Sequence, residues 1–518
     1  MAKLLDKQRY KCALGAMQTV QAITRAIPIL HSGPGCAQKL SDGTGSSGYF
    51  SPNIFPCTSI NEKDVVFGGT KKLETTIENA LKVIDADLYV VLTGCIPEIV
   101  GDDTGEVVSR FEDADKPVIY ASTAGFKGNN YIGHEQVIDA IIDQYLEKSE
   151  EREKGLVNIW ADVPYQNLFW LGNIRELEKL LAEIGLKPNT IFGYNRGIDQ
   201  INKIPKAEFN LLVSPWVSAK NMQKMEKKLG LPWLHIPTLP IGAYETSKFL
   251  REVGKFAGVD EEKVESVIGG HENYYYYLIE RYADLFLENR VINKQFSVVA
   301  DAQYALGITK FLANDLGLVP AKQFIVDDTP KQYREAITEE FKKLNFNLQA
   351  EVVFETDSYK IHEQIKEHED EIIEFAELGE YIDQPVRTYS SGMAARLGFA
   401  INMTMKPDIL IIDEAMGVGD RGFRIKCINR LKSIVSDENV TLLFVSGSML
   451  LNKQLCTRGI VIDSGKVAFD GPVKEAGKFY DTHFVRREPI EKSLEEELEE
   501  RSLELDTDDD DDDESEEM

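Results

Sequence analysis

The sequence lacks any run of 18 apolar residues, and its first residues, MAKLLDKQRYKCALGAM, contain no sustained apolar stretch of the signal-peptide kind. We therefore expect a soluble, cytoplasmic protein that makes no membrane contact and is not exported by a visible signal. Cysteine is also scarce, with six residues in a chain of 518. So few thiols in a long cytosolic chain indicate reduced cysteines or metal ligands rather than a disulfide framework.

Positive charge is in deficit. The chain has 58 Lys and Arg against 86 Asp and Glu, which gives a net charge of −28. Residues 488–518 carry −16 of this total, so the remainder is only mildly acidic. This balance argues against a nucleic-acid partner, because such proteins need a basic surface for the phosphates. Residues 485–518, which end in a run of aspartates, are predicted to form a disordered acidic tail.

Short apolar strands alternate with helices of 10–15 residues over most of the chain. This alternation predicts α/β architecture made of repeated Rossmann-like units with parallel sheets. Three units are expected, over residues 1–150, 151–292 and 293–370, and the third is too short to be complete. Each unit offers a ligand crevice at the carboxyl ends of its strands. A fourth segment follows over residues 371–484, in which a Ser- and Gly-containing stretch leads into a helix and further apolar strands.

Three cysteines of the first unit, Cys36, Cys57 and Cys95, each follow an apolar strand at a loop or helix start. Loops at strand ends converge in parallel sheets, so the three thiols are candidates for one site. Helix starts and Gly-rich turns favour the thiolate, which suits iron–sulfur chemistry. The alternative is that they are small buried residues, as free cysteines usually are, because their wide spacing is not a motif in itself.

The residues around these cysteines add a resemblance. Three segments closely resemble the cysteine segments of the nitrogenase component 1 family: GPGC, CTSINEKDVVFGGTKKL and TGCIPEIVGDDTGEV. Further similar segments extend the resemblance over roughly residues 9–370; among them are VNIWADVPYQNLFWLGNIRELEKLLAEIGL and SVVADAQYALGITKFLANDLGL. The resemblance implies that Cys36, Cys57 and Cys95 bind an iron–sulfur cluster, either shared and P-cluster-like or of the four-iron, four-sulfur type. It also implies that a homologous subunit supplies the missing ligands.

Within that family the chain is similar to β-type subunits, because no Cys and His pair stands in the contexts that hold the active-site cofactor of α-type subunits. The resemblance implies a nitrogen-fixation-like oxidoreductase: a heterotetramer with an α-type partner, reduced by an iron protein. Low-potential electrons would pass through the cluster to a reductive site in the partner. The substrate would be dinitrogen or another reducible molecule. The sequence departs from the family pattern at Gly125 of TAGF. This glycine stands near the position of a serine that can bind the oxidised cluster in the molybdenum enzyme.

Residues 371–480 resemble a second family, the ATPase subunits of ABC exporters, particularly those for polysaccharides. YSSGMAARLGFAI resembles the signature segment, which implies a γ-phosphate contact by Ser390, Ser391 and Gly392. ILIIDEAMGVGD resembles the magnesium-binding strand, which implies that Asp413 supports Mg²⁺ and Glu414 polarises the attacking water. No phosphate loop, GxxxxGK followed by Ser or Thr, occurs anywhere, and Gly447 replaces the histidine expected after the next strand. An autonomous ATPase is therefore not expected, although the segment could complete the ATP site of a partner chain.

Three hypotheses remain open from the sequence. The favoured one is the electron-relaying β-like subunit. The second is a scaffold for cluster or cofactor assembly, and the third is an ATP-binding half-site of an exporter. The tyrosine-rich segment ENYYYYLIERYADLFLE is predicted to be a packing stripe of a helix, formed by Tyr274, Tyr277, Tyr282 and Phe286.

Overall fold

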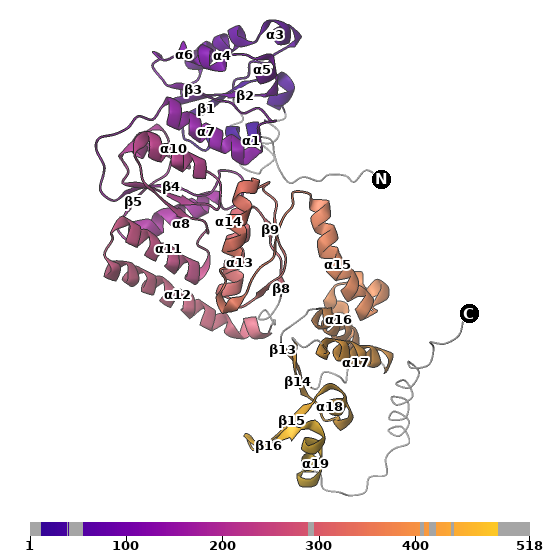
Figure 1. The fold of residues 1–518 in the computed structure, drawn as a ribbon. Helices are drawn as coiled ribbons and strands as arrows, with labels where there is room; N and C mark the ends of the chain where they lie inside the picture. Colours follow the sequence, from indigo (N-terminus) through magenta and orange to yellow (C-terminus); the bar gives the residue numbers. More distant parts are fainter. Residues whose placement is uncertain are drawn as a thin grey trace, which may run out of the picture. The chain divides into compact units, whose positions relative to one another are not determined.

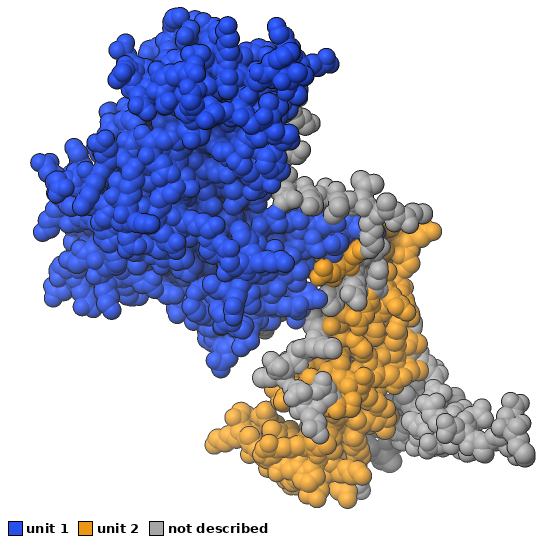
Figure 2. Space-filling view, turned by 45° about the horizontal axis from the view of Figure 1, so that its top comes forward, with its two compact units in different colours: residues 1–362 blue, residues 363–518 orange. Residues whose placement is uncertain are grey.

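The computed structural model describes residues 12–38, 40, 55–288, 295–404, 409–413, 421–436 and 440–484. The chain divides into two compact units, residues 1–362 (unit 1) and residues 363–518 (unit 2) (Figure 2). The finer division into five segments stays a prediction, and the predicted tail lies outside the described residues. Among the helices that the structure describes, none is long and apolar enough to cross a membrane.

The first sheet of unit 1 is parallel, with the strand order β1-β2-β3. Its central strand, LYVVLT, is buried at every position, which explains why the sequence there lacks polar alternation. Tyr89 and Val91 pack with residues of α4 and α6, whereas Val90 and Leu92 pack with residues of α1 and α7. The two pairs of helices lie on opposite faces of the sheet (Figure 1). The elements are α1 (Cys12–Gln21), β1 (Ala26–His31), α3 (Glu62–Phe67), α4 (Thr70–Val83), β2 (Leu88–Thr93), α5 (Cys95–Val100), α6 (Thr104–Ser109), β3 (Val118–Ala121) and α7 (Asn130–Gln144).

Helices α1 and α7 approach each other very closely at Gly15. A Cβ atom added there would overlap the backbone of Asn130, so the contact requires glycine. This close packing joins the two helices into one layer under the first sheet.

The second sheet has the order β5-β4-β6-β7 and is also parallel. The segment NTIFGYN, residues 189–195, is apolar enough to suggest a strand, but the strand is found at Lys187–Asn189. The following residues turn instead, because Gly193 and Asn195 have positive φ angles of 114° and 57°. The elements are β4 (Leu156–Trp160), α8 (Trp170–Glu183), β5 (Lys187–Asn189), α9 (Ile198–Lys203), η1 (Ile204–Lys206), β6 (Phe209–Val213), α10 (Ala219–Leu229), β7 (Trp233–Ile236), α11 (Gly242–Ala257) and α12 (Glu261–Glu288).

The last part of unit 1 contains short parallel strands, in the orders β12-β11-β9 and β10-β8. Together with the first two sheets they confirm the predicted α/β fold class of parallel sheets with an incomplete third repeat. The elements are β8 (Gln295–Phe296), β9 (Val299–Ala300), α13 (Ala302–Asn314), β10 (Val319–Pro320), β11 (Gln323–Ile325), α14 (Lys331–Phe341), η2 (Asn345–Asn347), β12 (Val352–Phe354) and α15 (Ser358–Ala376), which continues into unit 2.

The tyrosines of α12 do not form the predicted packing stripe. Tyr274, Tyr277 and Tyr282 are 65%, 49% and 55% exposed, and the side chain of Phe286 lies outside the described residues. The helix instead packs through Val264 and Ile268, which join the core next to α11. The prediction was wrong because α12 packs against α11 through residues that precede the tyrosines.

Unit 2 contains a parallel pair of strands, β13-β14, and an antiparallel pair, β15-β16. Leu410 and Ile412 of β13 are buried in the core of this unit. On the alternate positions, Ile411, Leu443 and Val445 are 68%, 52% and 56% exposed, so the other face of the pair is apolar and uncovered. The elements are η3 (Gly379–Asp383), η4 (Val386–Thr388), α16 (Ser391–Thr404), β13 (Ile409–Asp413), α17 (Arg421–Val435), β14 (Thr441–Val445), α18 (Met449–Leu455), β15 (Arg458–Asp463), β16 (Lys466–Pro472) and α19 (Val473–His483).

Candidate metal centre

The candidate site lies at the carboxyl ends of β1, β2 and β3. These strands are parallel neighbours, so the segments that follow them emerge at the same edge of the sheet. Ser32 and Cys36 follow β1, Cys95 follows β2, and Gly125 follows β3. Cys57 reaches the same edge because it forms an isolated parallel bridge with Leu30 of β1.

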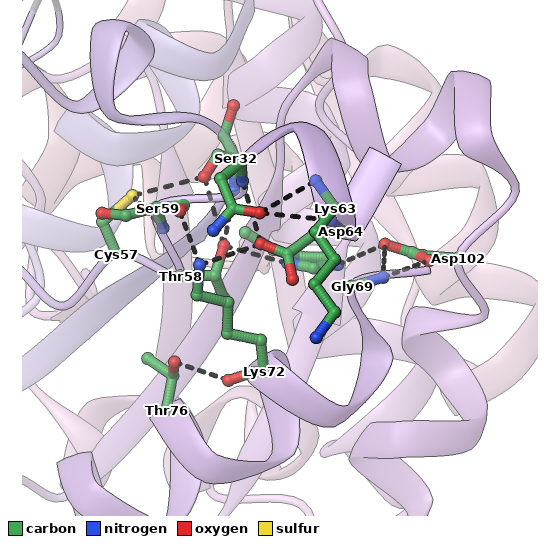
Figure 3. Close-up of polar contacts among 12 residues, drawn as sticks. Ser32, Cys57, Thr58, Ser59, Lys63, Asp64, Gly69, Lys72, Thr76 and Asp102 are labelled. Carbon is green, nitrogen blue, oxygen red and sulfur yellow. Dashed lines mark hydrogen bonds and ion pairs between the residues drawn. The ribbon is translucent and has the colours of Figure 1, made fainter. Parts of the chain in front are cut away.

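Cys57 is half-buried and lies against the segment that follows β1 (Figure 3). Its Sγ atom lies 3.6 Å from the carbonyl oxygen of Ser32, to which the thiol donates. The backbone N–H of Ser59 donates to the same sulfur at 3.3 Å. A backbone N–H can also donate to the sulfur of a metal-bound cysteine.

Cys95 is also half-buried and is the first residue of α5. The backbone N–H of Gly125 donates to its Sγ atom at 3.1 Å. The preceding Gly94 lies so close to Ser32 that an added Cβ would overlap the serine hydroxyl. The loops of Cys57 and Cys95 therefore both contact Ser32.

Cys36 is exposed and lies in the helical turn that follows Ser32, where its backbone N–H donates to Gly33 at 3.1 Å. The structure thus brings Cys57 and Cys95 against one segment and places Cys36 four residues further along it. Among the described residues, no three His, Cys, Asp or Glu side chains gather as ligands of a single ion. The donors nevertheless fit an iron–sulfur group, since the two half-buried sulfurs each accept a backbone N–H.

A buried hydrogen-bond network underlies these loops. His31, which is fully buried, contacts Thr58 Oγ1 through Nδ1 and Asp102 Oδ2 through Nε2, each at 3.2 Å. Thr58 in turn donates to the Ser32 carbonyl and accepts from the Ser32 N–H (Figure 3). Burial lowers the pKa of His31, although the neighbouring Asp102 acts in the opposite direction.

The network joins the three cysteine-bearing segments, because Ser32, Thr58 and Asp102 each belong to a different one. The carboxylate of Asp102 also accepts the Gly69 N–H through both oxygens, at 2.9 and 3.1 Å. The sequence analysis did not identify this role of His31. The available signal was the pair Asp102 and Asp103 directly after the Cys95 helix.

Two charged groups hold the outer loops. The ammonium of Lys72 donates to the Ser59 carbonyl at 2.7 Å and to Asp64 at 2.9 Å, which fixes the loop of Cys57 (Figure 3). Lys127, in the loop after β3, pairs with Glu98 of α5 at 2.6 Å. Burial disfavours the charged form of Glu98, but hydrogen bonds led by that from Lys127 outweigh it and lower its pKa.

Apolar side chains are exposed on the helix that Cys95 begins and on neighbouring segments. α3 and α5 contact each other and expose large apolar side chains, as does the loop after β3. The most exposed are Val66 (73%), Phe67 (80%), Ile99 (74%) and Phe126 (62%). Such a patch beside polar loops is typical of a protein–protein contact.

The residues predicted for an ATP site lie in unit 2. Ser390 caps α16 by accepting the Met393 N–H at 3.2 Å, Ser391 begins the helix, and both serines are exposed. Gly392 is the second helical residue. Asp413 is the last residue of β13, but its side chain and all of Glu414 lie outside the described residues.

The comparisons with known proteins agree with the fold. The model of the family "Nitrogenase component 1 type Oxidoreductase" matches residues 12–382. The chain belongs to this family. Two solved structures, "Nitrogenase Cp1 at pH 6.5" and "Nitrogenase Cp1 at pH 5", share its fold, with TM-scores of 0.59 and 0.56. The first is 19% identical and aligns 71% of this chain with 81% of its own, and the second is 17% identical and aligns 78% with 89%.

The C-terminal segment has separate relatives among ABC ATPases. Teichoic acids export ATP-binding protein TagH of Bacillus anthracis is 44% identical over 119 residues, which is 23% of this chain and 22% of that protein. The TagH proteins of Staphylococcus haemolyticus and Staphylococcus saprophyticus are 46% identical over 112 residues and 42% identical over 140 residues. These matches cover 22% and 26% of this chain and 42% and 53% of the two proteins. The chain therefore spans between about a fifth and about half of the length of these curated relatives.

Proposed function

We propose that this member of the nitrogenase component 1 family is a β-like subunit that donates Cys36, Cys57 and Cys95 to an iron–sulfur cluster and relays low-potential electrons. The observation that carries the proposal is the meeting of the Cys57 and Cys95 loops at Ser32, with a backbone N–H donated to each sulfur. When bound, the cluster would take up and release single electrons.

A partner subunit completes the site in this proposal. An iron–sulfur cubane normally needs four thiolates, and this chain offers three at the edge of the first sheet. The exposed apolar side chains of α3, α5 and Phe126 next to Cys95 support a homologous α-type subunit as the donor of the remaining ligands. The proposal includes a heterotetramer reduced by an iron protein, as the resemblance to the family implies, and free cysteines suit the reducing cytoplasm.

Gly125 affects the redox behaviour of the proposed site. It lies against Cys95, but a glycine has no side-chain oxygen to bind an oxidised cluster. In this chain, Gly125 contributes only a backbone N–H to the Cys95 sulfur. A ligand change from sulfur to a side-chain oxygen at this position is therefore not part of the proposal.

Iron binding tests the proposal. The full chain is purified anaerobically, incubated with ferrous iron and sulfide, and analysed for iron and acid-labile sulfide. We expect bound iron with sulfur-ligated absorption and a reducible electron paramagnetic resonance signal, both lost in Cys95→Ala. Cys427→Ala is the matched control, because Cys427 is buried in the core of unit 2 and burial raises the pKa of its thiol to about 12.

Two outcomes would contradict the proposal. If Cys95→Ala keeps all the iron, or if Cys427→Ala loses as much, the three cysteines are not the ligands. If the cluster binds but moves to a second apo-protein on mixing, the assembly-scaffold alternative replaces electron relay.

The similarity to TagH supports a second candidate, an ATP-binding half-site completed by another chain. Ser390 and Ser391 stand exposed at the start of α16, as a phosphate contact in trans requires. ATP turnover in the presence of a phosphate-loop partner, lost in Glu414→Gln, would support this role. Absence of ATP binding by the full chain with such a partner would exclude it.

A further inference from the structure

A second polar site lies in unit 1, away from the cysteines. The residues that follow β4, β6, β9 and β11 border one small cavity of about 10 Å³. A cavity of this size holds one guest about as large as a water molecule. Polar lining residues include Gln166, Asn167, Ser214, Asp301 and Asp327.

Some oxygen atoms at this cavity lack partners. Ser214 is 1% exposed, and its Oγ atom has no hydrogen-bond partner. Asp301 uses Oδ1 to cap α13, accepting the N–H groups of Gln303 and Tyr304 at 3.0 Å each. Its Oδ2 atom takes no part in that cap. A buried hydroxyl without a partner is costly, so a missing guest is indicated.

The cavity is also negative. Asp301 and Asp327 line it, and its lining contains no Lys, Arg or His. Asp162 lies beside it, is 2% exposed, and has a second unpartnered oxygen, Oδ2, while Oδ1 accepts from Asn167 of the lining at 2.8 Å. Asp327 is already satisfied, because it accepts from Trp216, Ala302 and Thr329. Uncompensated charge in a buried position favours a positively charged guest.

We propose that this cavity binds one hard cation, with Asp301 Oδ2 and Ser214 Oγ as protein ligands. Both residues line this space. Since no three carboxylate, histidine or cysteine side chains of the described residues converge on one ion, neutral oxygens complete the coordination shell. Such a set suits Ca²⁺, Mg²⁺ or K⁺ rather than a transition metal.

The bound cation would join elements from different sheets. Ser214 follows β6 of the second sheet, and Asp301 follows β9 of the last sheet. Each contributes one oxygen, so the ion would hold the incomplete third repeat to the second. This role is independent of the cluster proposed at the first sheet.

Cation-dependent unfolding of the full chain tests the site. The protein is stripped with a chelator into a tetramethylammonium buffer, and thermal unfolding is followed by tryptophan fluorescence while Ca²⁺, Mg²⁺ or K⁺ is added separately. We expect the midpoint to rise saturably with at least one cation, because a ligand that binds the folded state stabilises it. Trp216 lines the cavity, and so the fluorescence reports this part of the molecule.

Asp301→Asn should abolish the saturable rise while keeping the helix cap, since asparagine caps as well as aspartate does. Asp103→Asn is the matched control: Asp103 caps α6 outside the cavity and should leave the response unchanged. Ser214→Ala should weaken the apparent affinity at least about tenfold. The acidic tail also attracts cations, so the difference between wild type and Asp301→Asn is the quantity that decides.

The proposal is overturned if no cation raises the midpoint of the wild-type chain. It is equally overturned if Asp301→Asn and Ser214→Ala both respond as the wild type does. In either case the guest would be a water molecule.

Discussion

Single residues of unit 1 carry carboxyl groups that are buried without an ion pair among the described residues. Burial raises the pKa of Glu135 to about 7 and that of Asp162 to about 6. A carboxyl group whose pKa is higher in the folded than in the unfolded state takes up a proton on folding. Its contribution to stability is therefore greatest below the unfolded pKa and is lost as the pH rises through the folded pKa.

Glu135 offers the clearest test of this effect. Its Oε1 atom accepts the Ser218 N–H at 2.8 Å, and a glutamine can keep that bond without charge. We expect Glu135→Gln to exceed the free energy of unfolding of the wild type by less than about 1 kcal/mol near pH 5 and by about 3 kcal/mol at pH 8. Urea denaturation at the two pH values measures the difference.

The exposed Glu153 provides the control for this variant. Its pKa is lowered, chiefly by the hydrogen bond from Lys187, so Glu153→Gln should give no gain at pH 8. An equal effect of Glu135→Gln at pH 5 and pH 8 would contradict the assignment of Glu135 as a buried acid that resists ionisation.

At the scale of elements, the layer under the first sheet depends on how closely two helices approach. Gly15 of α1 faces the backbone of Asn130 at the start of α7, with no room for a side chain. Protein cores are packed densely enough that one extra methyl group at such a crossing forces backbone shifts. The same helices pack against one face of the sheet whose edge presents the cysteines.

Gly15→Ala should lower the free energy of unfolding by about 1–3 kcal/mol, because the added methyl group overpacks the helix crossing. Gly172→Ala is the same substitution in α8 at an exposed position with no neighbour near the added Cβ. It should instead stabilise the chain by up to about 1 kcal/mol, since alanine is the better helix former. Chemical denaturation measures the change in the free energy of unfolding for both variants. The same sign of this change in both would contradict the close contact at Gly15.

Some elements and site residues could be predicted from the sequence, and others could not. The strand Leu88–Thr93 is a continuous apolar run, so its burial in a parallel sheet was readable. That Cys36 and Cys95 follow neighbouring strands at one edge of the sheet was predictable, because parallel neighbours share an edge, whereas Cys57 reaches this edge through a bridge with Leu30. The pairing of His31 with Asp102 and the cavity between Ser214 and Asp301 were not, because they join residues more than 70 positions apart through side-chain packing.

The whole molecule consists of two compact units whose unfolding can be followed by different spectroscopic signals. All four tryptophans, Trp160, Trp170, Trp216 and Trp233, lie in unit 1, whereas both units contain helices. Tryptophan fluorescence therefore reports unit 1 alone, while circular dichroism reports both units. Separate cores predict separate unfolding transitions.

We expect circular dichroism in urea to show a transition that tryptophan fluorescence does not. Leu431 is fully buried in the core of unit 2, so Leu431→Ala should destabilise that unit by about 2–5 kcal/mol and shift only this transition. The fluorescence midpoint should not move. Coincident curves for both probes, or a fluorescence shift in the variant, would show that the units unfold as one.

The uncovered face of β13 and β14 also has a consequence for handling the protein. Ile411, Leu443 and Val445 form a water-facing apolar strip on a two-stranded sheet. At low ionic strength the strong net negative charge keeps neighbouring molecules apart, but added salt screens that repulsion. High protein concentration and high ionic strength should thus favour aggregation through this strip, and dilute solutions of low ionic strength should prevent it.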